Sequence, residues 1–320
     1  MSAERITGIL VGAPPSSLPP GVLESIPDFD VVRLADASPA QLATAELALV
    51  WDFRWRGLAE VLERAPRLRW IHAGSAGVDH LLPALLERPD IELTNSAGVF
   101  ERPIAEYVLG LLLAHAKGFA ETSRAQAERR WAYRETADLD GGTLVVVGAG
   151  RIGTAIARIG VAVGLRAIGV RRTAAEVMPP FERIVGVASL ADVIGVADFV
   201  VVATPATSGT ERLVDAAVLA AMRPTAYLVN IGRSSAVDTA ALVAALKAGT
   251  IAGAALDVFD EEPLPPSHPL WRAPNLFVSP HMSGDAAGWA ARIVELFGAN
   301  VRAWRSGAPL QGSVDRTRGY

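Results

Sequence analysis

The 320-residue sequence contains no cysteine. A disulfide framework, a thiolate metal site and a cysteine nucleophile are therefore excluded. Lysine is almost as scarce, because only Lys117 and Lys247 occur and arginine supplies the remaining basic charge. The net charge of −4 leaves no basic excess for binding nucleic acid or an anionic membrane, so neither is expected as a partner.

Long hydrophobic runs are also missing. The most apolar stretch, residues 104–116 (IAEYVLGLLLAHA), is too short to span a bilayer and carries Glu106 and His115. The first residues, MSAERITGILVGAPP, place two charges before one short apolar run, which predicts a first strand instead of a signal peptide. We therefore expect a soluble, cytoplasmic protein.

Short apolar runs alternate with helical patterns along most of the chain. The runs are nearly continuous in apolar residues, which is typical of parallel strands covered by helices on both faces. They are ITGILVGA, FDVVRL, LALVW, RLRWIHAG and IELTNSAG before residue 98, and TLVVVGAG, LRAIGVRR, DFVVVATP, AYLVNIG, IAGAALDVF and LFVSPH after residue 140. Helical candidates include GLAEVLERAP (57–66) and VDHLLPALLER (78–88). Two such series predict two α/β domains, and the helical stretch 286–307 is expected to pack back on the first domain.

The segment GAGRIG (148–153) lies between the apolar run TLVVV and a helical pattern. In such a turn, Gly148 allows the tight bend, Gly150 lets the backbone approach a pyrophosphate, and Gly153 permits close packing of helix on strand. In this context the spacing predicts a dinucleotide-binding turn. A glycine-rich turn without a ligand is the alternative.

The next strand ends in GVRRT (169–173), which places Arg171 and Arg172 where an acidic side chain commonly binds the ribose of NAD. Two guanidinium groups can instead bind the 2′-phosphate of NADP through charge-assisted, forked hydrogen bonds. The pair predicts a preference for NADP(H), with NAD(H) still possible. The alternative is that both arginines only solvate an exposed strand end.

Three further polar residues lie at or after the ends of apolar runs: Arg233 in NIGRSSAVD, Glu262 before a proline, and His281 in LFVSPHMSG. An arginine can bind a carboxylate, and a histidine supported by a carboxylate can transfer a proton. Taken singly, each could be structural: a strand cap, a solvated loop acid and a core histidine. Structural roles are expected for the remaining histidines, which are His72, His80, His115 and His268.

Together these motifs resemble the D-isomer-specific 2-hydroxyacid dehydrogenases over nearly the whole chain. The resemblance is carried by AGSAGVDHL (73–81), NSAGVFERPIAEYVLGLLLA (95–114), GAGRIG, ATPATSGT (203–210), NIGRSSAVD (230–238), ALDVFDEEPLP (255–265) and SPHMSG (279–284). It implies α/β architecture with two doubly wound parallel sheets, in which an NAD(P)-binding Rossmann domain (99–282) is inserted in a flavodoxin-like substrate domain (1–98 plus 283–320). The active site would lie in the cleft between the domains. The resemblance also implies a homodimer, with the apolar helix near 104–117 at the interface.

The resemblance assigns roles to individual residues. As catalytic residues, Arg233 would bind the substrate carboxylate and carbonyl, His281 would be the acid/base, and Glu262 would support His281. The substrate loop would be Ser75, Ala76 and Gly77, with the N–H groups of Ala76 and Gly77 on the carboxylate. Cofactor contacts would come from Gly148, Gly150, Arg151, Ile152, Gly153, Arg171, Arg172, Thr204, Pro205, Ile231 and Asp257, the last on the nicotinamide amide. No metal ligands are expected.

The predicted activity is therefore reduction of a small 2-oxo acid by NADPH. Glyoxylate or hydroxypyruvate is favoured because the SAGVD turn brings no extra basic cluster for a substrate phosphate. Two alternatives stay open: a nucleotide-sensing, corepressor-like protein without turnover, and a phosphonate- or formate-type dehydrogenase. Trp131 could line the substrate pocket or only pack. Ser234 stands where many relatives have glycine, and little effect is expected from this small replacement.

Overall fold

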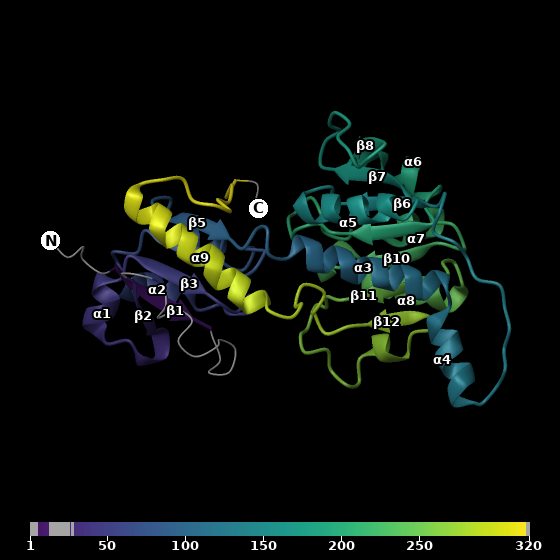
Figure 1. The fold of residues 1–320 in the computed structure, drawn as a ribbon, viewed down its shortest axis with the longest axis horizontal. Helices are drawn as coiled ribbons and strands as arrows, with labels where there is room; N and C mark the ends of the chain where they lie inside the picture. Colours follow the sequence, from purple (N-terminus) through teal and green to yellow (C-terminus); the bar gives the residue numbers. More distant parts are fainter. Residues whose placement is uncertain (1–5, 13–25, 27–28, 318–320) are drawn as a thin grey trace. The chain divides into compact units, whose positions relative to one another are not determined.

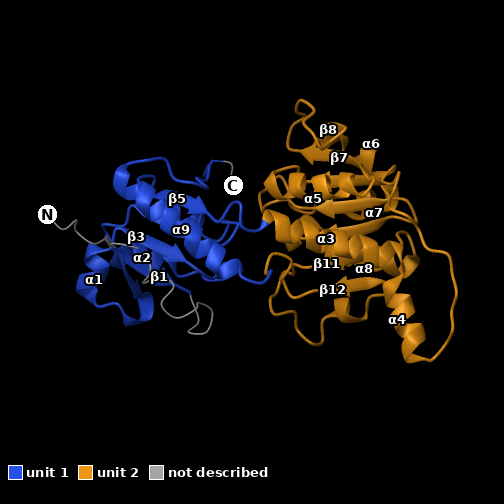
Figure 2. Ribbon diagram, viewed as in Figure 1, with its two compact units in different colours: residues 1–100, 286–320 blue, residues 101–285 orange. Residues whose placement is uncertain are grey.

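The computed structural model describes residues 6–12, 26 and 29–317. The chain divides into two compact units (Figures 1 and 2). Unit 1 consists of residues 1–100 and 286–320, and unit 2 of residues 101–285. Residues 286–320 therefore belong to the same unit as the first hundred residues.

Unit 1 contains a five-stranded parallel sheet in the order β2-β1-β3-β4-β5, which is the flavodoxin-like order. Its strands are β1 (Ile6–Val11), β2 (Phe29–Arg33), β3 (Leu47–Val50), β4 (Trp70–Ala73) and β5 (Glu92–Asn95). Its helices are α1 (Pro39–Thr44), α2 (Leu58–Arg64) and α9 (Trp289–Ser306), with short 3-10 turns η1 (Leu34–Asp36) and η2 (Pro83–Leu85). The carboxyl end of β4 leads directly into the predicted substrate loop.

Helix α9 packs on the unit 1 sheet through aromatic side chains. The Phe297 ring lies 5.5 Å from the rings of Phe29 and Trp70, and Trp304 stacks on Trp70 at 5.6 Å. Phe297 and Trp70 are fully buried, and such ring pairs add to the hydrophobic gain of burial. These contacts hold the C-terminal helix to the first hundred residues.

Unit 2 contains a seven-stranded parallel sheet in the order β12-β11-β10-β9-β6-β7-β8. Its strands are β6 (Thr143–Val147), β7 (Arg166–Arg171), β8 (Arg183–Gly186), β9 (Phe199–Val202), β10 (Tyr227–Asn230), β11 (Gly253–Leu256) and β12 (Leu276–Val278). Its helices are α3 (Glu101–Ala116), α4 (Phe119–Ala127), α5 (Arg151–Ala162), α6 (Leu190–Ile194), α7 (Ala216–Ala221) and α8 (Thr239–Ala248), with 3-10 turns η3 (Val187–Ser189), η4 (Ser234–Ala236) and η5 (Pro269–Arg272). This is the Rossmann order, and the order of the strands reverses between β6 and β9, where such sheets bind ligands. The predicted fold class is therefore confirmed.

Two local predictions were wrong or incomplete. Residues 78–88 were predicted as a helix, but the chain forms turns there and only the short η2. Pro83 lacks an N–H group for an α-helix, while Val78, Leu81 and Leu85 still bury their side chains. Strand β8 was not predicted, because its four residues are a weak signal.

The apolar character of α3 has an explanation within unit 2. The buried side chains of this helix include Ile104, Val108, Leu111 and Leu112, and α3 packs against α5. Its hydrophobic face is therefore covered inside the protomer, and its composition alone does not indicate a subunit interface.

Beneath α9, unit 1 contains a buried chain of polar side chains. Trp70 Nε1 donates to Thr94 Oγ1 at 2.9 Å, and the Thr94 hydroxyl lies 2.7 Å from His72 Nδ1. Ser96 Oγ donates to the Ala73 carbonyl at 2.9 Å and lies 3.2 Å from His72 Nε2. Because the Ser96 hydroxyl gives its single hydrogen to the Ala73 carbonyl, it accepts from Nε2–H of His72, and in the neutral ring Nδ1 then accepts from the Thr94 hydroxyl. Burial lowers the pKa of His72 to about 3.

His72 therefore predicts loss of stability in acid. Its pKa is lower in the folded state than in the unfolded state, so the unfolded state binds more protons below about pH 6.5. The stabilisation is complete above that pH and falls by ~1.4 kcal/mol per pH unit as the pH decreases toward the folded value. The free energy of unfolding should thus be about 2 kcal/mol lower at pH 5 than at pH 7.5 from this residue alone. Denaturant titrations of wild type and His72→Gln test this, and equal pH slopes for the two proteins would show that His72 is not responsible.

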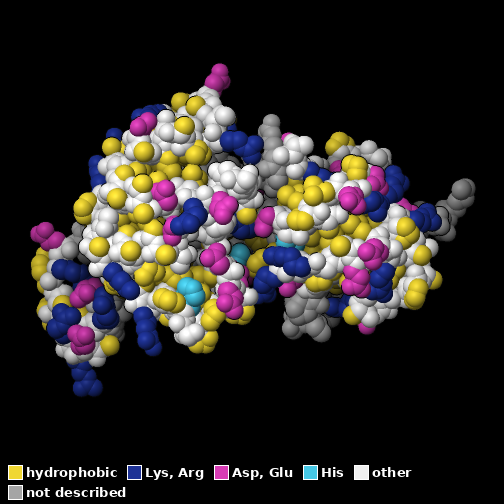
Figure 3. All heavy atoms as spheres, turned by 180° about the vertical axis from the view of Figure 1, so that it is seen from behind, with side chains coloured by type: hydrophobic (Ala, Val, Ile, Leu, Met, Phe, Trp, Pro, Cys, Tyr) yellow, Lys and Arg dark blue, Asp and Glu magenta, His cyan; other side chains and the backbone are white. Residues whose placement is uncertain are grey.

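Charged side chains are distributed over the surface. On the face presented in Figure 3, arginine and lysine side chains are interspersed with acidic ones. No helix among the described residues has both the length and the hydropathy to cross a membrane.

Candidate active site

The glycine turn between β6 and α5 has the geometry of a nucleotide-binding turn. Gly148 has a φ of +103°, and a Cβ there would lie 2.6 Å from the Ala203 carbonyl oxygen. A Cβ at Gly153 would collide with the Gly148 carbonyl oxygen. A Cβ at Gly150 would meet no atom within 4 Å, so the backbone there borders open space. Each glycine thus meets the requirement expected from its position.

The N-terminus of α5 is free to receive an anion. Its N-cap is Gly150, which provides no side-chain hydrogen bond, and its first turn contains no acidic residue. By contrast, α7 and α8 are capped by the carboxylates of Asp215 and Asp238. The unpaired N–H groups and the positive end of the α5 dipole suit a pyrophosphate, so this turn fits a dinucleotide.

Three exposed arginines surround this turn. Gly148 and Ala149 donate their N–H groups to the Val170 carbonyl, which places the end of β7 beside the turn. Arg171 ends β7 and Arg172 follows it, while Arg151 is the first residue of α5. Over the described residues, none of these guanidinium groups has a hydrogen bond or an ion pair. Their charges are therefore available to a ligand.

Two loops at the carboxyl edge of the unit 2 sheet lie against each other. Thr204 follows β9, and a Cβ at Gly232, after β10, would lie 2.7 Å from the Thr204 carbonyl oxygen. Ile231 donates its N–H to Val202, and the Pro205 carbonyl accepts from the Thr210 hydroxyl at 2.7 Å. Within the described structure the buried Thr204 hydroxyl has no hydrogen-bond partner. The predicted contacts Thr204, Pro205 and Ile231 thus lie on adjacent loops.

Glu262 and His281 are in direct contact. His281 Nδ1 lies 3.0 Å and 2.9 Å from the two carboxylate oxygens of Glu262. Glu262 Oε1 also accepts the N–H of Phe259 at 3.0 Å, which fixes the carboxylate. With Nδ1 directed at the carboxylate, Nε2 is the ring nitrogen placed to exchange a proton with another molecule. His281 has a φ of +54°, a conformation that is uncommon outside glycine and occurs often at functional sites.

Asp257 holds the loop that carries His281. Its Oδ1 accepts from the Ser279 hydroxyl at 2.6 Å and the Met282 N–H at 3.0 Å, and its Oδ2 accepts the Ser283 N–H at 2.9 Å. Asp257 is only 1% exposed, and a buried carboxylate requires such donors. From the sequence, Asp257 is expected only to contact the cofactor. Its position at the end of an apolar strand was the one signal for this structural role.

Arg233 is positioned by a buried residue that the sequence analysis did not single out. Asn230 ends β10, donates Nδ2 to the Arg233 carbonyl and accepts the Gly232 N–H at Oδ1, both at 3.0 Å. Arg233 Nη1 donates to the Gly232 carbonyl at 3.0 Å, and the side chain is half-buried. The turn that carries the Arg233 guanidinium is therefore held by the Asn230 side chain and by the hydrogen bond from Arg233 to the Gly232 carbonyl.

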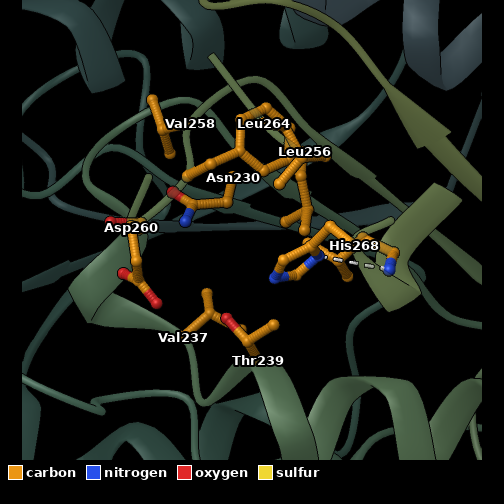
Figure 4. A pocket seen from close by; sticks show the side chains of 11 residues that line it. Asn230, Val237, Thr239, Leu256, Val258, Asp260, Leu264 and His268 are labelled. Carbon is orange, nitrogen blue, oxygen red and sulfur yellow. Dashed lines mark hydrogen bonds between the residues drawn. The ribbon is translucent and has the colours of Figure 1, made fainter. Parts of the chain in front are cut away.

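A small pocket lies beside this turn within unit 2. It is lined by Asn230, Ser234, Val237, Thr239, Leu256, Val258, Phe259, Asp260, Leu264, His268 and Leu270, and not by the three predicted catalytic residues. Figure 4 shows the His268 ring directed into it, with Asn230, Val237 and Thr239 around it. His268 Nδ1 accepts the Leu270 N–H at 3.3 Å and so caps η5.

The predicted substrate loop of unit 1 has its carbonyl groups tied down. The Ser75 carbonyl accepts the Ser96 N–H at 3.0 Å, the Ala76 carbonyl accepts Asn95 Nδ2 at 2.8 Å, and the Gly77 carbonyl accepts the Ser75 hydroxyl at 2.7 Å. The N–H groups of Ala76 and Gly77 donate to no group of the described structure. Two adjacent N–H groups without a partner in the described structure are available to bind an anion.

Trp131 and Tyr133 lie in the segment after α4 and are 98% and 87% exposed. Trp131 therefore does not pack within its own protomer. Among the described residues, no three His, Asp or Glu side chains are grouped to bind a metal ion.

A glycine turn for a dinucleotide, together with a histidine paired to a carboxylate, is the arrangement of a nucleotide-dependent dehydrogenase. Residues 109–283 match the family described as "D-isomer specific 2-hydroxyacid dehydrogenase, NAD binding domain". The chain is 35% identical over 290 residues to a glyoxylate reductase of Aeropyrum pernix, covering 87% of this chain and 85% of that one. It is 36% identical over 254 residues to a glyoxylate reductase of Thermofilum pendens, covering 76% and 74% of the two chains.

Solved structures agree with these matches. An NADPH-dependent glyoxylate/hydroxypyruvate reductase of Sinorhizobium meliloti, in complex with NADP and sulfate, superposes with a TM-score of 0.83 at 26% identity, covering 99% of this chain and 100% of that one. A 2-hydroxyacid dehydrogenase of Xanthobacter autotrophicus in complex with NADPH gives 0.83 at 30% identity, with 99% and 100% covered. The chain belongs to the D-isomer-specific 2-hydroxyacid dehydrogenase family. It is an NAD(P)-dependent oxidoreductase similar to glyoxylate/hydroxypyruvate reductases.

Proposed function

We propose that this protein reduces a small, unphosphorylated 2-oxo acid of the glyoxylate or hydroxypyruvate type to the 2-hydroxy acid, with NADPH as the preferred reductant. The contact between Glu262 and His281, at 2.9–3.0 Å, is the observation that carries the proposal. A histidine held by a carboxylate can transfer a proton to a reacting group, which supports turnover over nucleotide binding alone.

Three residues of the chain would each have a separate role in the reaction. The Arg233 guanidinium binds the substrate carboxylate and polarises the adjacent carbonyl, because it is planar and permanently charged. When bound, NADPH would supply the hydride that reduces the carbonyl carbon. His281 would give its Nε2 proton to the developing alkoxide, and Glu262 would orient the ring through Nδ1.

Further residues would set substrate and cofactor binding. The free N–H groups of Ala76 and Gly77, with Ser75 bracing the loop, support binding of the substrate carboxylate. Gly148, Gly150, Ile152 and Gly153 would hold the pyrophosphate, as the uncapped α5 suggests. Thr204, Pro205 and Ile231 would contact the cofactor from the neighbouring loops, and Asp257 would reach the nicotinamide amide.

The exposed guanidinium groups of Arg171, Arg172 and Arg151 support a preference for the 2′-phosphate of NADPH. The two relatives whose structures are described above were solved with NADP and NADPH. An NAD-specific site would need a carboxylate for the ribose hydroxyls, and β7 ends in arginine at that place.

We also propose a homodimer formed through unit 2. The exposed aromatic side chains of Trp131 and Tyr133 support this, because large exposed aromatics are enriched at protein interfaces. Sedimentation of the purified protein tests it, and the mass of a single protomer would contradict it.

The decisive assay follows the oxidation of NADPH with a panel of 2-oxo acids. Glyoxylate and hydroxypyruvate should give a kcat/KM at least about tenfold above a phosphorylated 2-oxo acid, since loop 75–77 carries no basic side chain to offset a buried phosphate charge. Formate and phosphonates with oxidised cofactor serve as the comparison. NADPH binding without turnover of any 2-oxo acid would identify a binding protein, and turnover of formate or a phosphonate would identify another reaction.

A further inference from the structure

After α9, the chain returns along β5 on the side away from β4. Asn95 donates its N–H to the Gly312 carbonyl at 2.9 Å, and Val314 donates to Leu93 at 3.0 Å. Thr94 and Ser313 form an antiparallel bridge between these hydrogen bonds. We name residues 311–314 the C-terminal segment.

The C-terminal segment is fixed by α9 itself. The Asn300 side chain donates Nδ2 to the Gln311 carbonyl and accepts the Gln311 N–H at Oδ1, both at 2.9 Å. Asn300 is fully buried, so both hydrogen bonds are shielded from water. The segment is therefore held between a buried residue of α9 and the edge of β5.

Asn95 connects the C-terminal segment to the substrate loop. Its backbone N–H is bound by Gly312, and its side chain donates to the Ala76 carbonyl at 2.8 Å. A trans peptide is planar, so its carbonyl and the following N–H point in opposite directions. By holding the Ala76 carbonyl, Asn95 sets the direction of the Gly77 N–H. Ser96 sets the direction of the Ala76 N–H in the same way, through the Ser75 carbonyl.

The connection between the C-terminal segment and the substrate loop is sensitive to the addition of one methyl group at Gly312, because Gly312 lies very close to Asn95. Gly312 has a φ of +76°, and a Cβ there would collide with the Asn95 carbonyl oxygen and lie 3.1 Å from its Oδ1. Gly307 at the end of α9 has a similar φ of +70°, but a Cβ there would meet no atom within 4 Å. A side chain at position 312 would therefore collide with Asn95, whereas a side chain at position 307 would not.

We propose that the C-terminal segment sets the affinity for the 2-oxo acid by holding Asn95, which orients the N–H groups of the substrate loop. Asn95 and Gly312 are positioning residues in this proposal, because the groups that contact the substrate are the N–H groups of Ala76 and Gly77. The inference rests on the proposed function of that loop.

The test compares Gly312→Ala with its matched control, Gly307→Ala. Both substitutions place alanine at a left-handed position, and only the first displaces Asn95. Gly312→Ala is expected to raise KM for the 2-oxo acid about tenfold, the effect of one lost hydrogen bond, with kcat and the Kd of NADPH nearly unchanged. Gly307→Ala should keep the KM of wild type. Equal KM values for the two variants would overturn the proposal.

A second variant, Asn95→Asp, tests the same connection without adding a side chain that collides with Asn95. Asn95→Asp loses the Nδ2 donor to Ala76 and keeps an oxygen for the Ala97 N–H, which the Asn95 side chain accepts at 3.2 Å. It should also raise KM for the 2-oxo acid. Combined with Gly312→Ala it should have less than the product of the two effects, because both act through one hydrogen bond. Fully multiplicative effects would overturn the shared pathway.

Binding of oxamate to the NADPH complex, measured by calorimetry, separates this inference from the proposed reaction. Oxamate is an unreactive carboxylate, so its Kd reports the substrate loop without turnover. If wild type binds oxamate but reduces no 2-oxo acid, the proposed function fails, while a weaker Kd in Gly312→Ala alone supports the inference. The same Kd in Gly312→Ala and Gly307→Ala, or no binding by wild type, would overturn it.

Discussion

Replacing His281 with alanine is expected to lower kcat for reduction of the 2-oxo acid by a factor of about 10² to 10⁴, the usual contribution of a general acid. The Kd of NADPH should stay near that of wild type, because the glycine turn and α5 are separate elements of unit 2. Steady-state kinetics and a fluorescence titration with NADPH measure the two quantities. His268→Ala is the control, because His268 caps η5 and forms no ion pair among the described residues.

Substitution of Glu262 by glutamine tests the partner of His281. The two Glu262 oxygens hold Nδ1 of His281 and so direct Nε2 toward the substrate. The glutamine amide keeps only one accepting oxygen, so kcat for reduction should fall while the Kd of NADPH stays near that of wild type. Near-normal kcat in His281→Ala would show that another group donates the proton. An unchanged kcat in Glu262→Gln would remove Glu262 from the mechanism.

The second large effect concerns the cofactor. Wild type is expected to have a higher kcat/KM with NADPH than with NADH, and Arg171→Asp should lower that ratio by about 10 to 100-fold or more. A hydrogen bond to a charged group contributes about 1.5 to 3 kcal/mol, and the new carboxylate would also repel the 2′-phosphate. The same carboxylate can accept hydrogen bonds from the ribose of NADH, so activity with NADH should be retained or improved.

Arg183→Asp provides the matched control for this change. Arg183 begins the neighbouring strand β8 and is exposed, so the substitution alters the net charge equally without touching the end of β7. The ratio for this variant should stay close to that of wild type. A wild-type enzyme that uses NADH at least as well as NADPH would contradict the assignment of Arg171 and Arg172.

The sequence by itself determined the fold class and the family. Continuous apolar runs such as TLVVV and LALV are required of parallel strands buried on both faces, and this requirement is local to each strand. The roles of the glycines in GAGRIG could also be predicted from the sequence, because each meets a steric requirement of a single turn. The polar residues Arg233 and His281 could be noticed because they follow apolar strands at the edge where such sheets bind ligands.

Only the tertiary structure decided which distant groups meet. Asp257 holds the His281 loop, and Asn95 joins the substrate loop to Gly312. Both arrangements depend on hydrogen bonds between segments far apart in sequence. That the apolar face of α3 packs against α5 was likewise decided by the tertiary structure. Hydrophobic periodicity indicates that a side chain is buried, but it does not say which residue the side chain contacts. The contact partner is determined by how the elements pack in three dimensions. For this physical reason such contacts could not be predicted from the sequence.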